Sequence, residues 1–98
     1  PGRFDWEINF PLPGPEDRAD ILAVSARDLK THGPLPHRRI AEETEGWSAA
    51  DLAAIWSEAA LLAVADGGRE VIMAEDYVGG AARVAAQRQR VKAEGRAS

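Results

Sequence analysis

The longest helical pattern in the chain runs from Ser48 to Asp66. Ser48 and Asp51 form a capping-box-like pair at its start, and Gly67-Gly68 supplies a stop, because glycine takes a left-handed conformation cheaply. Alanine, the best helix former, fills many of its other positions. The apolar residues recur at spacings of three and four and so share one helical face; they are Leu52, Ile55, Trp56, Ala59, Leu62 and Ala63. Because the helix is apolar or small over most of its circumference, we expect it to be the central helix of a bundle.

Three further helices are predicted around the central one, at about residues 16–30, at about residues 36–43 and from about residue 74 onward. Gly79 and Gly80 lie inside the last of these, where each costs about 1 kcal/mol relative to alanine. We interpret the pair as a point of close helix–helix packing. The side chains expected to face the core from these three helices are Ile21, Leu22, Val24, Leu29, Ile40, Ala41, Tyr77, Ala81, Val84 and Ala85. The predicted fold class is all-α, a small four-helix bundle.

A strand pattern precedes the helices. Between Phe4 and Phe10 apolar residues alternate with polar ones, and a segment rich in proline follows. A lone strand cannot satisfy its backbone hydrogen bonds. It therefore belongs to a sheet outside this chain, is disordered, or pairs between molecules. The chain also begins with Pro1 rather than methionine, and both features lead us to expect a piece of a longer protein.

Composition narrows the range of functions. The chain has 98 residues, 45% of them hydrophobic and 29% charged, which suits one small globular domain. It contains no cysteine, which excludes disulfides and cysteine-ligated zinc. No apolar run approaches the ~20 residues that span a bilayer, so no membrane partner is expected.

The net charge of −4 is unevenly distributed along the chain. Five of the twelve basic residues lie from Arg83 onward, where Glu94 is the one acidic residue, so the rest of the chain is strongly acidic. An acidic body disfavours nucleic-acid binding, and no nucleic-acid partner is expected. The basic tail is either a solvated helix end or a contact for an acidic partner.

A search for chemistry finds no self-contained active site. No Gly-x-x-x-x-Gly-Lys-Ser/Thr string is present, so nothing in the chain would hold the phosphates of a nucleotide unaided. His32 and His37 flank a proline loop without a credible third ligand; we interpret them as surface histidines and expect no metal site. Ser25, Ser48 and Ser57 lack a histidine and a carboxylate placed for nucleophilic catalysis.

Four strings of the sequence resemble AAA ATPases, in order and with matching spacing. Residues 1–5 and the Pro-Gly-Pro-x-x-Arg connector that ends at Arg18 resemble the run from the large domain of that family into its small domain. Residues 44–52 are similar to its Thr-x-Gly-aromatic-Ser-Gly-Ala-Asp-Leu string, and residues 57–61 to the Glu-Ala-Ala-Leu continuation. Residues 72–77 resemble its entry into the last helix.

The resemblance looks nearest to the segregase group of valosin-containing protein, with proteasomal ATPases and FtsH-like proteases as relatives. It implies that residues 15–92 form the lid and that residues 1–14, with the orphan strand, end the missing large α/β domain. Residues 93–98 are expected to be a frayed tail, as chain ends commonly are. The parent would be a cytoplasmic, homo-hexameric ATP hydrolase that uses ATP and Mg²⁺ to unfold or remodel protein substrates. Its lid would close over adenine and ribose and contact the neighbouring subunit. The chain alone should be inactive and should need no cofactor.

The resemblance also implies roles for five residues. Arg3 matches the second of two arginines before the strand, which helps an arginine finger reach the γ-phosphate of the neighbouring subunit. Ile21 matches an apolar position that touches adenine, and Ala49 and Ala50 match a Gly-Ala pair at the base and ribose. Ser25 stands where relatives often place a histidine near the ribose, and a serine reaches less far.

Two positions depart from the family pattern. Ala49 replaces the usual glycine and adds a methyl group near the expected ligand. Met73 replaces the Ser or Thr that would cap the last helix, which removes about 1 kcal/mol of capping.

A second hypothesis is a stand-alone helical interaction module that uses the basic tail to bind an acidic protein. The absence of a nucleotide-binding domain upstream of Pro1 in the reading frame would favour it.

Overall fold

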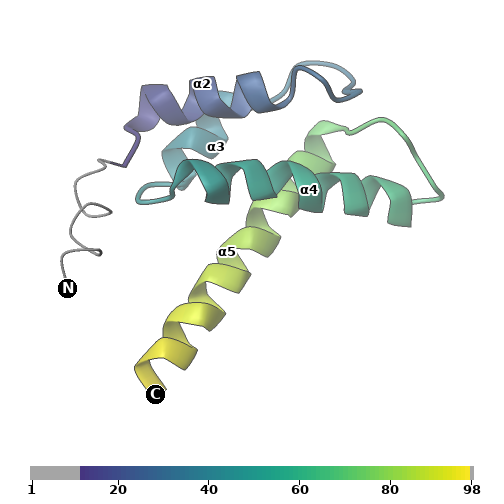
Figure 1. Ribbon diagram of the computed structural model, residues 1–98. Helices are drawn as coiled ribbons and strands as arrows, with labels where there is room; N and C mark the ends of the chain where they lie inside the picture. Colours follow the sequence, from purple (N-terminus) through teal and green to yellow (C-terminus); the bar gives the residue numbers. More distant parts are fainter. Residues whose placement is uncertain (1–11, 98) are drawn as a thin grey trace.

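The computed structural model describes residues 12–97, with side chains described through residue 90 (Figure 1). Within that range it contains four α-helices and no named strand, which confirms the predicted all-α four-helix bundle. The strand predicted at residues 4–10 lies outside the described residues. The helices are α2 (Pro15–Ser25), α3 (His37–Glu43), α4 (Ala49–Ala65) and α5 (Ala74–Ala97).

Helix α4 is the centre of the arrangement. In Figure 1, α2 and α3 lie along one side of it, while α5 crosses it and extends beyond the bundle. The loops that follow α2 and α4 meet at one end of the molecule, where backbone hydrogen bonds join His32 N–H to Ile72 O at 3.1 Å and Ile72 N–H to Lys30 O at 2.9 Å. None of the described helices is long and apolar enough to cross a membrane.

Both predicted ends of α4 are confirmed. The Ser48 hydroxyl accepts a hydrogen bond from the Asp51 backbone N–H at 3.2 Å, and the Asp51 carboxylate accepts from the Ser48 N–H at 3.1 Å. This reciprocal pair satisfies two of the donors that a helix start leaves free. At the other end Gly67 and Gly68 both have a φ of 76°, a conformation that glycine adopts without strain.

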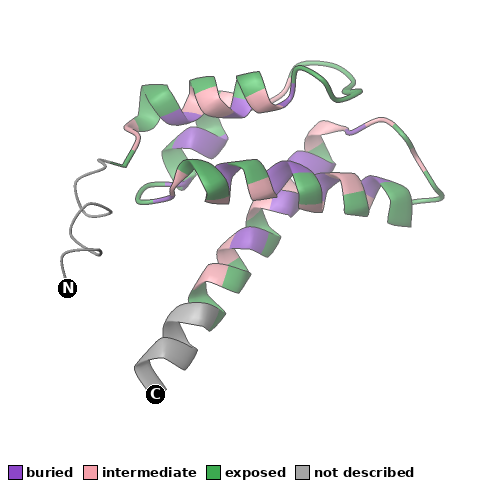
Figure 2. Ribbon diagram, in the orientation of Figure 1, coloured by how far each residue is buried: buried purple, intermediate pink, exposed green. Residues whose placement is uncertain are grey.

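The core lies where α2 and the first half of α5 pack on α4, with α3 packed mainly on α2 (Figure 2). Trp56 lies at its centre: its ring stacks on that of Tyr77 with centroids 4.3 Å apart and an interplanar angle of 16°. Tyr77 is fully buried. The predicted core residues that the structure buries are Leu22, Ile40, Ala41, Leu52, Ile55, Trp56, Ala59, Ala63, Tyr77 and Val84.

Two predicted core residues are exposed, and the reason lies in α2. Val24 is 53% exposed and Leu29 is 37% exposed. The buried face of α2 carries Arg18 and Leu22 and continues to Ala26, so Val24, two residues from Leu22, points away from it. The prediction for Leu29 was wrong because the helix ends at Ser25 rather than Lys30. The chain tightens there, with hydrogen bonds that reach back three residues, such as Leu29 N–H to Ala26 O at 3.0 Å.

The close approach expected at Gly79 and Gly80 is confirmed at the crossing of α5 and α4. A Cβ atom on Gly80 would lie 2.6 Å from the carbonyl oxygen of Ile55 and 2.9 Å from the backbone nitrogen of Ala59. A Cβ atom on Gly79 would lie 2.9 Å from the Cδ1 atom of Leu62. The backbones of the two helices therefore come together at Gly80 with no room for a side chain.

Arg18 is buried, with 4% of its surface exposed. Its Nε donates to the carbonyl oxygen of Ala41 at 2.8 Å, and its Nη1 donates to that of Pro13 at 2.9 Å. This arginine ends the Pro-Gly-Pro-x-x-Arg connector. Its two bonds fix the connector and α2 against α3, so the chain enters the bundle in a defined direction.

Candidate functional site

The first turn of α4 carries two of the predicted site residues. Ala49 and Ala50 are both exposed, and they lie between Ser48 and Asp51, the two residues that close the capping box. Because the caps hold this turn and its side chains are small, a ligand could come close to its backbone. The local sequence thus gives a rigid and accessible helix start.

Helix α2 carries the other two described candidates. Ile21 and Ser25 are four residues apart and therefore lie on one face of the helix, and both are half-buried. The indole N–H of Trp56 holds α2 against α4 by a 3.1 Å hydrogen bond to the carbonyl oxygen of Leu22. The four candidates thus lie as two pairs on neighbouring helices, and a shared ligand stays a prediction. Arg3 lies outside the described residues.

A surface hollow of about 540 Å³ opens at the base of α2, but it is not the predicted site. Ile21, Ser25, Ala49 and Ala50 are not among the residues that form it. Its lining comes from the connector, α3 and the turn before α4: Leu12, Pro13, Gly14, Pro15, Arg18, Glu42, Glu45 and Gly46. None of the four predicted contacts therefore belongs to this hollow.

The first turn of α4 is also held from α5, by a contact that the sequence did not predict. Arg88 Nη1 lies 2.5 Å from the Asp51 carboxylate, and the Arg88 guanidinium carbon lies 5.0 Å from the centre of the Trp47 ring. Arg83 makes a second bridge to α4, with Nε 2.9 Å from Glu58 Oε1. Arg88 is therefore half-buried against α4, whereas Arg83, 53% exposed, pairs with Glu58 at the surface as a solvated residue of the tail.

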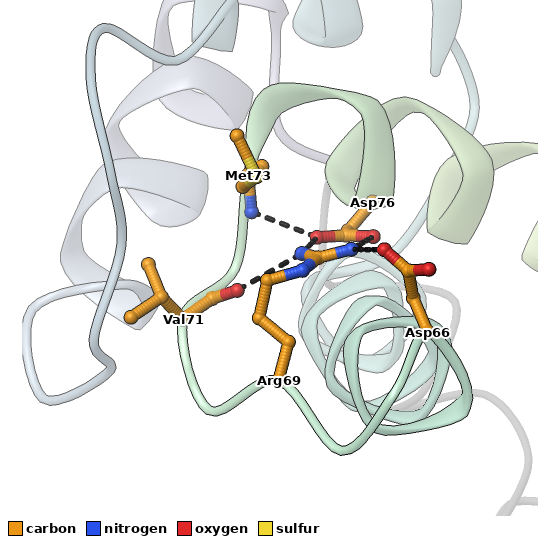
Figure 3. A network of polar contacts seen from close by, with 5 residues as sticks. All are labelled: Asp66, Arg69, Val71, Met73 and Asp76. Carbon is orange, nitrogen blue, oxygen red and sulfur yellow. Dashed lines mark hydrogen bonds and ion pairs between the residues drawn. The ribbon is translucent and has the colours of Figure 1, made fainter.

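Arg69 joins the end of α4 to the start of α5 (Figure 3). Its guanidinium donates to the carboxylates of Asp76 and Asp66 and to the Val71 carbonyl oxygen at 3.1 Å. The Asp76 carboxylate also accepts from the backbone N–H of Met73 at 2.8 Å. Asp76 therefore makes one of the two bonds of a capping box at the start of α5, although Met73 has no side-chain oxygen to make the other.

The same contacts shift the acidity of both partners. The hydrogen bond from Arg69 holds the pKa of Asp76 below its usual range. The bonds to Asp76 and then Asp66 raise the pKa of Arg69. Since both shifts favour the charged forms, the Arg69–Asp76 bridge stays ionised at neutral pH.

His37 is a half-buried residue of the bundle, which corrects its interpretation as a surface histidine. Its Nδ1 lies 2.9 Å from the Tyr77 hydroxyl, and its ring lies edge-on to those of Tyr77 and Trp56. Burial lowers the pKa of His37 and raises that of Tyr77. His32 is exposed, as predicted. Among the described residues no three histidine or acidic side chains are grouped to hold a metal ion.

Comparison with known proteins gives one matching family model and several relatives. Residues 38–77 match the family model of the AAA+ lid domain. The chain is 46% identical over 78 residues to a proteasome-activating nucleotidase of Pyrococcus furiosus, which covers 80% of this chain and 19% of the relative. It is 36% identical over 78 residues to the 26S proteasome regulatory subunit 10B of Dictyostelium discoideum, covering 80% of this chain and 20% of the relative.

A third relative comes from another group. The chain is 42% identical over 77 residues to the ATP-dependent zinc metalloprotease FtsH of Acidothermus cellulolyticus, covering 79% of this chain and 11% of that protein. The chain therefore spans about a fifth or less of the length of these curated relatives.

Proposed function

We propose that this chain is the lid domain of a ring-forming ATPase of the proteasomal or FtsH kind, because residues 38–77 match the AAA+ lid model and a proteasome-activating nucleotidase is 46% identical over 78 residues. Relatives in both of these groups support the proposal. They give no support to the segregase group of valosin-containing protein, which the sequence strings resembled most. The proposed parent hydrolyses ATP in the cytoplasm and couples hydrolysis to the unfolding of protein substrates.

Within that parent, the lid covers the base and ribose of the nucleotide. Ile21 supplies an apolar contact for the adenine, Ala49 and Ala50 let the ligand approach the start of α4, and Ser25 lies toward the ribose. The half-buried position of Ile21 and the exposed, capped turn at Ala49 and Ala50 fit this role. Mg²⁺ and the phosphates need residues outside this chain, because the sequence has no phosphate-binding loop.

The remaining parts of the proposal concern the ring. The lid contacts the neighbouring subunit in a homo-hexamer, and Arg3 helps an arginine finger act on the nucleotide of that neighbour. A fixed positive charge at that place would stabilise the transferring phosphoryl group. The chain alone hydrolyses no ATP, and clear turnover by the purified 98-residue chain would contradict this.

The observation that carries the proposal is the first turn of α4. It combines two small exposed side chains with the reciprocal hydrogen bonds of Ser48 and Asp51. Substitution of Ala50 by glutamate in the full-length protein tests it. A carboxylate at this turn would repel the nucleotide, so Ala50→Glu should raise the KM for ATP at least about tenfold, equivalent to about 1.4 kcal/mol of binding. Ser57→Glu adds the same charge at an exposed position two turns along α4.

The control decides the outcome. Ser57→Glu should leave the KM for ATP close to that of the unmodified protein, because Ser57 lies away from the predicted contact. Equal KM values for Ala50→Glu and Ser57→Glu would overturn the proposal. Circular dichroism of both variants should show the helical content of the parent, since both residues are exposed.

The stand-alone interaction module is the weaker alternative. It relied on the basic tail, but Arg83 and Arg88 are already paired with Glu58 and Asp51 of α4. A partner protein would have to compete with these internal bridges.

A further inference from the structure

Asp51 is the meeting point of two helices. Its Oδ2 atom accepts the Ser48 backbone N–H at 3.1 Å and also binds Arg88 Nη1. The same oxygen therefore caps the start of α4 and ties that start to α5. Any displacement of Arg88 must break the bridge or move the carboxylate that closes the capping box.

The Arg88 guanidinium has a second partner in Trp47. It lies over the ring of Trp47, which is 6% exposed and directly precedes Ser48. Trp47, Glu43, Ala85, Gln89 and Arg88 line one small hollow between the end of α3 and α5. A cation over an aromatic face gains electrostatic attraction that adds to the ion pair. Arg88 thus contacts Trp47, just before Ser48, and Asp51, three residues after it, and is placed to set the direction of the turn.

The bridge is suited to positioning more than to stability. The side chains of Arg88 and Asp51 are each 31% exposed, and ion pairs with such access to water add little to the stability of a fold. Arg83 and Glu58 make a comparable bridge between the same two helices, but at the middle of α4. The feature particular to Arg88 is that its partner belongs to the turn that contains Ala49 and Ala50.

We propose that Arg88 is a positioning residue that couples α5 to the nucleotide-facing turn of α4. It acts through Asp51 and Trp47 and touches no nucleotide itself. When α5 shifts relative to α4, the turn at Ala49 shifts with it, and nucleotide bound at that turn in return favours one position of α5. The proposal rests on the proposed function, because it needs Ala49 and Ala50 to face the nucleotide.

Kinetics of the full-length protein with Arg88→Gln test the proposal, and Arg83→Gln is the matched control. Arg88→Gln should raise the KM for ATP about fivefold or more, since about fivefold is the lower end of the usual range for coupling between two sites. The kcat should stay within about twofold, because no group that touches the reacting atoms is removed. Arg83→Gln also removes one arginine bridge between α5 and α4, and should leave the KM within about twofold, as expected for an exposed ion pair.

A conservative variant separates positioning from packing. Arg88→Lys keeps a cation that can pair with Asp51 and lie over Trp47, so it should restore most of the affinity. Hydrogen exchange in the same proteins supplies a readout independent of activity. Arg88→Gln should speed exchange at the amides of Asp51 and Leu52, which bond back to Ser48, whereas Arg83→Gln should leave them unchanged.

The failures of the two proposals can be told apart. An unchanged KM in Ala50→Glu overturns the proposed function and, with it, the role of Arg88. A raised KM in Ala50→Glu together with an unchanged KM in Arg88→Gln overturns only the role of Arg88. Equal effects of Arg83→Gln and Arg88→Gln would also overturn it, because they would indicate general docking of α5 in place of control over this turn.

Discussion

The indole Nε1 of Trp56 donates a hydrogen bond to the backbone carbonyl oxygen of Leu22 at 3.1 Å, which joins α4 to α2. The same indole ring also contacts α5, because it stacks on the ring of Tyr77. One side chain therefore holds both α2 and α5 to the central helix. This explains why α2 and α5 can be fixed by a helix whose other core residues are aliphatic.

Trp56→Ala should remove this link and leave a cavity in the core. We expect the free energy of unfolding of the 98-residue chain to fall by about 3–5 kcal/mol, the usual cost of truncating a buried aromatic residue to alanine. Urea denaturation followed by circular dichroism measures the loss. Ser57→Ala, at the exposed neighbouring position, should change stability by less than about 0.5 kcal/mol. An unchanged unfolding midpoint in Trp56→Ala would show that α4 is not the hub of the bundle.

Helix α4 could be predicted from the sequence because its signals are local. Ser48 and Asp51 cap it from three residues apart, Gly67 and Gly68 end it, and the apolar spacing marks its buried face. The close packing at the glycines of α5 could also be predicted, since two adjacent glycines weaken a helix and are best explained by a neighbouring helix that leaves no room for side chains. Each of these signals lies within a few residues of the feature that it predicts.

The polar contacts between helices could not be predicted in the same way. His37 meets Tyr77 across 40 positions of sequence, and Arg88 meets Asp51 across 37. Nothing local distinguishes His37 from the exposed His32, or Arg88 from the other bases of the tail. Their partners are set by the crossing of α5 over α4, which hydrophobic periodicity does not specify. The exposure of Val24 could have been predicted from the sequence, because Val24 follows Leu22 by two residues and a two-residue step places it on the outer face of the helix.

Gly80→Ala should destabilise the chain although alanine is the better helix former. The added Cβ would meet backbone atoms of Ile55 and Ala59 at 2.6 Å and 2.9 Å, and backbone cannot turn aside as a side chain can. The overpacking should cost about 1–3 kcal/mol against a gain of about 1 kcal/mol in helix propensity. Contacts with backbone put the cost toward the upper end, so we expect a net loss of up to about 2 kcal/mol. Thermal unfolding should therefore show a lower midpoint.

Gly79→Ala is the matched control for this prediction. Its Cβ would meet only the Cδ1 end of the flexible Leu62 side chain, which can change rotamer. The gain in propensity should then offset the contact, and the midpoint should stay equal or rise. A Gly80→Ala chain as stable as Gly79→Ala would show that the helix backbones do not touch at Gly80.

Asp76→Asn should weaken the junction between α4 and α5. The Asp76 side chain is buried and accepts from both Arg69 and the Met73 N–H. Removal of its charge leaves the Arg69 guanidinium with a weaker partner, so we expect a loss of about 2 kcal/mol or more in the free energy of unfolding. Asp66→Asn alters the other partner of Arg69, but that side chain is 71% exposed and the change should be below about 1 kcal/mol. Equal losses in chemical denaturation would contradict the assignment of Asp76 as the junction cap.

The burial of His37 should make stability depend on pH. Burial lowers the pKa of His37 below its ordinary value of 6.5 in the folded chain, while the unfolded chain keeps the ordinary value. The unfolded state therefore binds a proton first, and its stability relative to the folded state grows as the pH falls. The contribution of neutral His37 is complete above about pH 6.5 and is lost as the pH falls through its lowered folded value.

Denaturation of the 98-residue chain at a series of pH values measures this effect against two variants. His37→Asn keeps an oxygen that can accept from the Tyr77 hydroxyl but has no proton to take up, so its stability should fall less than that of the parent chain below about pH 6.5. His32→Asn replaces the exposed histidine and should retain the pH profile of the parent. Parallel profiles for the parent and His37→Asn would show that His37 has the same pKa in both states, and would remove burial against Trp56 and Tyr77 as the source of the shift.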